Sequence, residues 1–247
     1  MLNDLLLLSG NSIPFPEARV TIHQPSLKEI AYIGEEQFFI GFELFRFTKN
    51  ILSEEDKALS KDKSNFDIII AILGERNAVM QKNSICAKML LALIFPEYNI
   101  ALSKNAIVLT KDEENFLIDN SNFSVFQQIL IDMFSYDKKE DSKSVINPIG
   151  EMGNRIAEKM RKRQETLSKL KHKDGEQKKV DILSRYASII SIALSIDINT
   201  VLSYTVYQLF DTVRRYHLKE SFDIYMRARM EGASGLKEPE EWMKDIH

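Results

Sequence analysis

The spacing of apolar and polar residues predicts strands only in the first half of the chain. Residues 13–25 contain three prolines around an alternating run, in which Val20 and Ile22 face one way. Alternation of this kind predicts a short, half-buried strand. Residues 98–118 hold three short apolar runs separated by polar residues, which predicts a small meander or hairpin.

Helices are predicted around these strands. Ser26, followed three residues later by Glu29, indicates a capping box at the start of a helix over residues 27–47. Gly34 and Gly41 lie inside this stretch, so we do not expect the helix to be straight. Three further apolar stretches are expected to be helical: residues 66–75, residues 84–95, which stop before Pro96, and residues 123–134, with Asn122 as their cap.

From Pro148 onward the apolar pattern is helical throughout. Residues 180–196 predict a strongly apolar helix, and the sequence DINT after it predicts a break, with Asn199 or Thr200 capping the next helix. A helical stretch then runs as far as Gly232. Its opening part carries a single apolar face with helical spacing, formed by Leu202, Val206, Leu209, Val213 and Tyr216.

We therefore expect a mainly α protein. Its N-terminal α+β portion, residues 1–136, carries a short strand and a small hairpin. Residues 137–147 are polar and charged and form the best candidate for a linker. The C-terminal portion, residues 148–247, is expected to be a helical bundle with a tail that contains the only tryptophan, Trp242. The pattern leaves open whether the two portions share one core.

Composition narrows the class of protein without indicating its chemistry. Hydrophobic residues make up 44% of the chain and charged residues 28%, which is ordinary for a globular protein. The single cysteine, Cys86, lies in an apolar run and suits a reducing compartment. We find no signal peptide and no apolar run long enough to cross a membrane.

No motif indicates an enzyme. The four histidines, His23, His172, His217 and His247, are far apart in sequence and lack the spacing of metal ligands. We therefore expect no catalytic residue, metal or other cofactor. Trp242 is costly to leave in water, so it either folds back on its own domain, which we favour, or anchors a partner.

The whole chain has a net charge of -3, but one segment is locally basic. Residues 155–179 contain ten Lys or Arg and four Asp or Glu residues. Three interpretations stay open: the solvated face of a helix, which we favour, a contact surface for an acidic protein, and a nucleic-acid contact. No aromatic residue lies among these cations to stack on bases, so we do not expect nucleic acid.

Several segments resemble one family of proteins from tailed bacteriophages. They are NPIGEMGNRIAEKMRKRQETLSKLK at 147–171, TVYQLFDTVRR at 205–215, EGASGLKEPEEWMKDI at 231–246, and IHQPSLKEIAYIGEEQFF at 22–39. Together they resemble the tail assembly chaperones, although Glu231 stands where those proteins often have alanine. The likeness covers both ends of the chain and leaves the middle unmatched.

The resemblance implies a non-enzymatic protein of the host cytoplasm. Such chaperones keep the tape measure protein soluble and help tail tube subunits assemble around it, which makes these two proteins the expected partners; self-association stays open. We place the protein-binding surface at Arg161, Arg163, Lys169, Tyr207, Arg214 and Trp242. Two alternatives remain: a structural or adaptor component of the tail or neck that stays in the virion, and a nucleic-acid-binding regulator using the basic helix 156–173.

Overall fold

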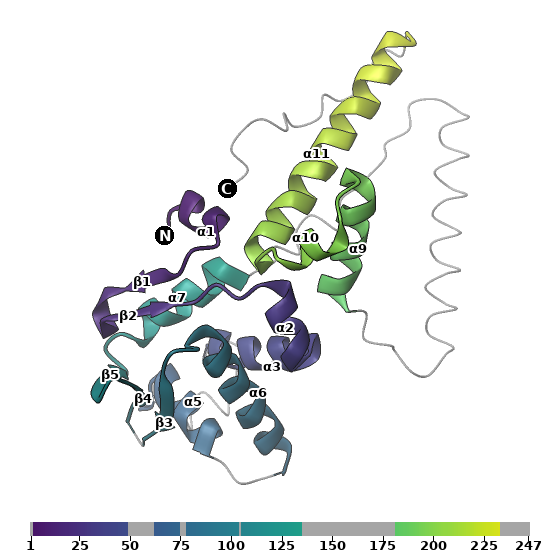
Figure 1. The fold of residues 1–247 in the computed structure, drawn as a ribbon. Coiled ribbons are helices and arrows are strands. Elements are labelled where there is room, and N and C mark those ends of the chain that lie inside the picture. Colours follow the sequence, from purple (N-terminus) through teal and green to yellow (C-terminus); the bar gives the residue numbers. More distant parts are fainter. Residues whose placement is uncertain (1, 49–61, 75–77, 104, 135–180, 233–247) are drawn as a thin grey trace. The chain divides into compact units, whose positions relative to one another are not determined.

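The computed structural model forms two compact units, of which the larger combines both halves of the sequence. The larger unit comprises residues 1–135 and 181–212, and the smaller one residues 136–180 and 213–247. The structure describes residues 2–48, 62–74, 78–103, 105–134 and 181–232 (Figure 1). The predicted linker, 137–147, therefore lies outside the described residues.

The chain begins with helix α1 (Asp4–Ser9) and a small antiparallel hairpin. Strand β1 (Ile13–Phe15) and strand β2 (Val20–Ile22) flank a 3₁₀ turn, η1 (Pro16–Ala18), and Ile13 pairs with Ile22. Val20 and Ile22 are buried while Thr21 is exposed, which confirms the predicted strand. Its partner β1 was not predicted, because Pro14 interrupts its short apolar pattern.

The helix predicted over residues 27–47 is present but broken. It divides into α2 (Leu27–Ile33) and α3 (Glu35–Arg46), with Gly34 between them at a φ of 88°. Only glycine adopts this backbone region easily, so the break depends on Gly34. The capping box at the start of α2 is confirmed, since Ser26 and Glu29 exchange both expected hydrogen bonds.

Two helices and a three-stranded sheet follow. Helices α5 (Asn65–Gly74) and α6 (Ala78–Ile94) confirm the predicted apolar helices, and α6 ends before Pro96. The antiparallel sheet, in the order β3-β4-β5, confirms the predicted meander and consists of β3 (Asn99–Leu102), β4 (Ile107–Lys111) and β5 (Glu114–Ile118). Asp112 and Glu113 form the tight turn between β4 and β5, both with positive φ.

Helix α7 (Phe123–Phe134) supplies the aromatic centre of the core. The ring of Phe126 lies 6.1 Å from that of Phe15, 5.7 Å from that of Phe45 and 6.1 Å from that of Phe95. One side chain of α7 thus contacts β1, α3 and the residue after α6. Asn122 precedes α7 as expected, but its side chain bonds back to Asp119 and Leu117 rather than onto the helix.

The C-terminal helices confirm the mainly α class, with corrections at their ends. They are α9 (Ile182–Leu194), α10 (Ile198–Leu202) and α11 (Val206–Met230). The predicted cap, Asn199 or Thr200, is wrong: Asp197 caps α10, where its side chain accepts a hydrogen bond from the N–H of Asn199 at 2.7 Å. In the part of the chain that the structure describes, no helix is long and apolar enough to cross a membrane.

Candidate functional site: an exposed apolar surface on α9 and α10

Two of the segments singled out in the sequence meet in the larger unit. Ser26, at the start of α2, forms an antiparallel bridge with Thr205, at the start of α11. The N–H of Leu27 donates to the carbonyl of Tyr204 at 2.8 Å. The segment 22–39 and the segment 205–215 are therefore in direct contact, although they lie near opposite ends of the sequence.

The polar residues of these segments are used to build this junction. Thr205 and Gln208 form a second capping box, with the N–H of Thr205 donating to Oε1 of Gln208 at 2.8 Å. Nε2 of Gln208 donates to the carbonyl of Leu8 at 2.7 Å. The buried Gln24 similarly donates to the carbonyl of Asn11 at 2.7 Å. These contacts give the motif residues an architectural role.

A second polar contact fixes helix α9. The carboxylate of Glu35, at the start of α3, accepts from the N–H of Leu183 at 2.7 Å and from that of Ser184 at 3.3 Å. An anion at a helix N-terminus satisfies free N–H groups and complements the helix dipole. The inner face of α9 is buried through Leu183, Tyr186, Ala187 and Ile190. Its outer face is therefore presented in a fixed orientation.

That outer face carries exposed isoleucines between serines and Arg185. We define the α9 apolar surface as four exposed side chains, with exposed fractions of 42% for Ile189, 81% for Ile192, 42% for Leu194 and 38% for Ile198. Ile189 and Ile192 are three residues apart on the side of α9 opposite its buried residues, and Leu194 and Ile198 flank the turn into α10. Clustered exposed apolar side chains of this kind mark a surface for binding a protein.

Two charged residues accompany this surface, Arg185 and Asp197. The guanidinium of Arg185, one turn before Ile189, sits 5.2 Å from the centre of the Tyr186 ring. Asp197 lies between Leu194 and Ile198, where its carboxylate caps α10. The surface thus has a cation at one end and an anion between its last two apolar side chains.

The predicted binding residues fall into two groups. Tyr207 and Arg214 are both half-buried on α11, and their spacing of seven residues puts them on the same helix face. Arg161, Arg163, Lys169 and Trp242 lie outside the described residues, as does the basic helix 156–173. The role of all six residues in binding stays a prediction.

The α9 apolar surface was missed from the sequence, although a signal was present. Residues 180–196 carry apolar side chains on more than one helix face, more than a single buried stripe needs. We interpreted this only as a strongly apolar helix and assigned it no exposed face. The structure buries one side of α9 and leaves Ile189 and Ile192 exposed.

Among the described residues no group of three or more His, Cys, Asp or Glu side chains could hold a metal ion. Cys86 is buried, and burial raises the pKa of its thiol. A buried, protonated thiol is a poor nucleophile.

The comparison with known families bears on the part of the chain that carries this surface. Residues 176–247 match the family model of the YomV second domain. This is a phage-associated domain, and the matched range includes α9, α10 and α11. No curated protein and no solved structure matches the chain.

Proposed function

We propose that this chain is a phage tail assembly chaperone that binds amphipathic helices of the tape measure protein through the α9 apolar surface. The observation that carries the proposal is the exposure of Ile189 and Ile192 on a helix whose position is fixed by its buried face and by Glu35. The surface lies inside the range that matches a phage-associated domain. The resemblance of both chain ends to tail assembly chaperones supports the same role.

The physical basis of the proposal is the shielding of apolar surface. A tape measure helix with an exposed apolar stripe aggregates unless that stripe is covered. Docking the stripe on the α9 apolar surface buries apolar side chains of both proteins, each worth about 1.5–3 kcal/mol before ordering costs are subtracted. A surface of only four side chains gives modest affinity. Modest affinity suits a chaperone that tail tube subunits must displace.

The test is co-expression of the full chain with the tape measure and tail tube proteins encoded near its gene, followed by pull-down at low and high salt. We expect capture of the tape measure protein and an increase in its soluble fraction. Ile192→Asp should abolish both effects, because it places a charge in the apolar contact. Ile224→Asp is the matched control, since Ile224 is also exposed, at 62%, but lies on α11; it should retain both.

Three other outcomes would contradict this proposal. If Ile192→Asp captures the tape measure protein as well as the unaltered chain does, the α9 apolar surface is not the binding site. Copies of the chain in purified particles, without rescue of tape measure solubility, would favour a structural or adaptor component. If the chain captures only nucleic acid, and this binding is lost as the salt concentration rises, the result would favour a nucleic-acid-binding regulator.

A further inference from the structure

The strand β3 forms an edge of its sheet, and its outer backbone groups can be identified from the register. The N–H of Ser103 donates to the carbonyl of Ala106 at 2.9 Å, which makes these two residues a hydrogen-bonded pair. Hydrogen-bonded pairs recur at every second residue in an antiparallel ladder, so Ala101 and Asn99 also bond to β4. The N–H and C=O groups of Ile100 and Leu102 therefore point away from β4, toward the free edge.

This edge is unpaired within the described structure. No backbone or side-chain hydrogen bond from any other described residue reaches the backbone of Ile100 or Leu102. A strand edge of this kind is a template for a further strand. The side chains of Ile100 and Leu102 are half-buried and lie on the same face as their buried partners on β4, Leu109 and Ile107. The inward face of the sheet is thus apolar up to its edge.

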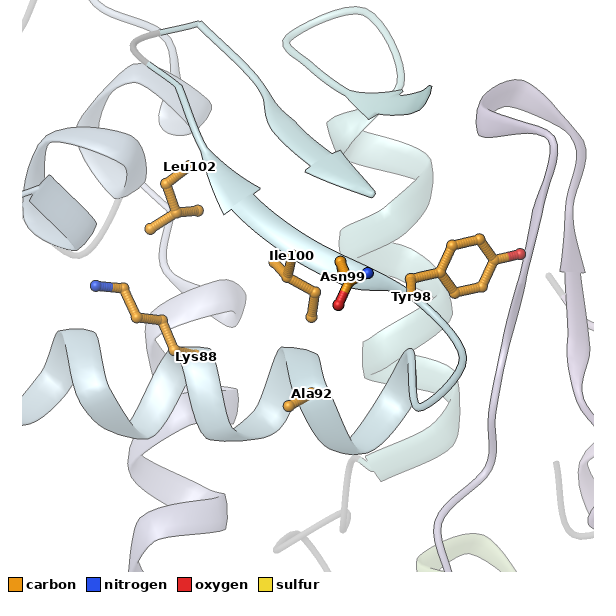
Figure 2. A pocket seen from close by; sticks show the side chains of 6 residues that line it. All are labelled: Lys88, Ala92, Tyr98, Asn99, Ile100 and Leu102. Carbon is orange, nitrogen blue, oxygen red and sulfur yellow. The ribbon is translucent and has the colours of Figure 1, made fainter. Parts of the chain in front are cut away.

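A pocket of about 500 Å³ lies against this edge. Figure 2 shows β3 running across helix α6, with Lys88 and Ala92 rising from the helix toward Ile100 and Leu102 of the strand. The pocket is lined by Lys88, Ala92, Tyr98, Asn99, Ile100 and Leu102. It therefore occupies the space beneath the position that a fourth strand would take.

Two residues of α6, Lys88 and Ala92, line this space. Ile85 is 50% exposed and Met89 is 37% exposed, and both share the outer face of α6 with Ala92. Lys88 carries the only charge among the lining residues. Neighbouring cations have partners, since Lys82 pairs with Glu36 and Lys111 with Glu97. In the described part of the chain no carboxylate forms an ion pair with Lys88.

We propose that the edge of β3 binds an extended peptide segment of another protein, which adds to the sheet as a fourth strand. Its backbone bonds to the outward N–H and C=O groups of Ile100 and Leu102, and one inward apolar side chain fills the pocket above Ala92. An acidic side chain at the end of the segment beside Leu102 pairs with Lys88. Backbone pairing supplies affinity in this mode, and the pocket and the cation supply selectivity. The proposal is independent of the α9 apolar surface.

The test uses the full chain and fluorescein-labelled hexapeptides that alternate Thr and Val and end in either Glu or Lys. Fluorescence anisotropy should show that the Glu peptide binds about tenfold more tightly than the Lys peptide, because it gains a charge-assisted hydrogen bond. Lys88→Glu should reverse this preference. Lys28→Glu is the matched control, because it makes the same charge change at an exposed position on α2, and it should leave both affinities unchanged.

Two further measurements examine the backbone pairing. Ile100→Pro removes an N–H that points away from β4, so the sheet should persist while peptide binding is lost. N-methylation of the peptide gives the same information with the protein unaltered. Methyl groups on the alternate residues that face β3 should abolish binding, and those on the intervening residues should not.

Three outcomes would overturn the proposal. The first is no binding of the Glu peptide, and the second is binding that neither N-methyl pattern affects. The third is a dimer of the chain that Ile100→Pro dissociates, since the edge would then pair with a second copy. Light scattering of the unaltered protein and of Ile100→Pro distinguishes that case.

Discussion

Gly41 of α3 and Cys86 of α6 meet backbone to backbone. A Cβ atom placed on Gly41 would lie 2.6 Å from the carbonyl oxygen of Cys86 and 3.0 Å from its carbonyl carbon. The obstructing atoms belong to the helix backbone, so they cannot rotate away as a side chain does. Helices α3 and α6 can approach this closely only because position 41 has no side chain.

We predict that Gly41→Ala destabilises the fold. The added methyl group must push α3 and α6 apart, and overpacking of this kind costs about 1–3 kcal/mol, partly offset by the better helix propensity of alanine, about 1 kcal/mol. Urea unfolding followed by circular dichroism measures the change. Gly74→Ala is the control, because a Cβ at Gly74 meets nothing within 4 Å, and it should be neutral or slightly stabilising.

The thiol of Cys86 should be almost inert in the folded protein. The side chain is buried, and burial raises the pKa of the thiol, so both access and thiolate fraction are low. Reaction with dithionitrobenzoate at neutral pH should be slower by about two orders of magnitude or more than in urea. Gly41→Ala should accelerate it, because the substitution loosens the contact around Cys86. Equal rates in the native and unfolded states would contradict the burial.

The capping box of α2 should make part of the stability depend on acid pH. Burial alone would raise the pKa of the Glu29 carboxyl, but hydrogen bonds from the hydroxyl and N–H of Ser26, with His23 alongside, outweigh it and hold that pKa below its ordinary value. A lowered carboxyl pKa stabilises the fold above the ordinary value of 4.5 and loses that effect as pH falls through the folded-state pKa.

Glu29→Gln tests this pH dependence, because glutamine also fits a capping box but does not titrate. The unaltered protein should be the more stable of the two at about pH 7, and the difference should shrink by about pH 3. Urea unfolding at both pH values gives the comparison. A difference that stays constant with pH would show that the Glu29 charge contributes nothing.

Two isoleucines of α9, Ile190 and Ile192, should differ sharply in how much their truncation to alanine destabilises the fold. Ile190 is 0% exposed, so Ile190→Ala should cost about 2–5 kcal/mol through lost burial and a cavity. Ile192 is 81% exposed, so Ile192→Ala should change the free energy of unfolding by about 0.5 kcal/mol or less. Thermal unfolding of both variants measures the contrast. A large loss for Ile192→Ala would mean that this side chain is covered rather than available for binding.

Local patterns predicted much of this fold because short-range physics determines those features. The alternation at Val20 and Ile22, the spacing of Ser26 and Glu29, and the stop before Pro96 each depend on a few neighbouring residues. A helix that is not straight was also expected from Gly34 and Gly41, and the structure breaks it at Gly34. These features need no knowledge of the rest of the chain.

Features that depend on distant partners were not predictable in the same way. Nothing in the sequence marks Gln24 and Gln208 as structural residues, because their hydrogen bonds to the carbonyls of Asn11 and Leu8 form only in the folded chain. The exposure of Ile192 depends on which side of α9 the core covers, and periodicity alone does not select it.

The hydrogen bond from Gln208 to Leu8 joins residues 200 positions apart, which sets an order of events during synthesis. Residues before α9 leave the ribosome well before their partners at Tyr204, Thr205 and Gln208. At about 5–20 residues per second the delay is roughly 10–40 s. During that interval α1 and α2 lack these contacts, so the nascent chain is exposed to aggregation and proteolysis. Folding of the larger unit is therefore completed late in translation.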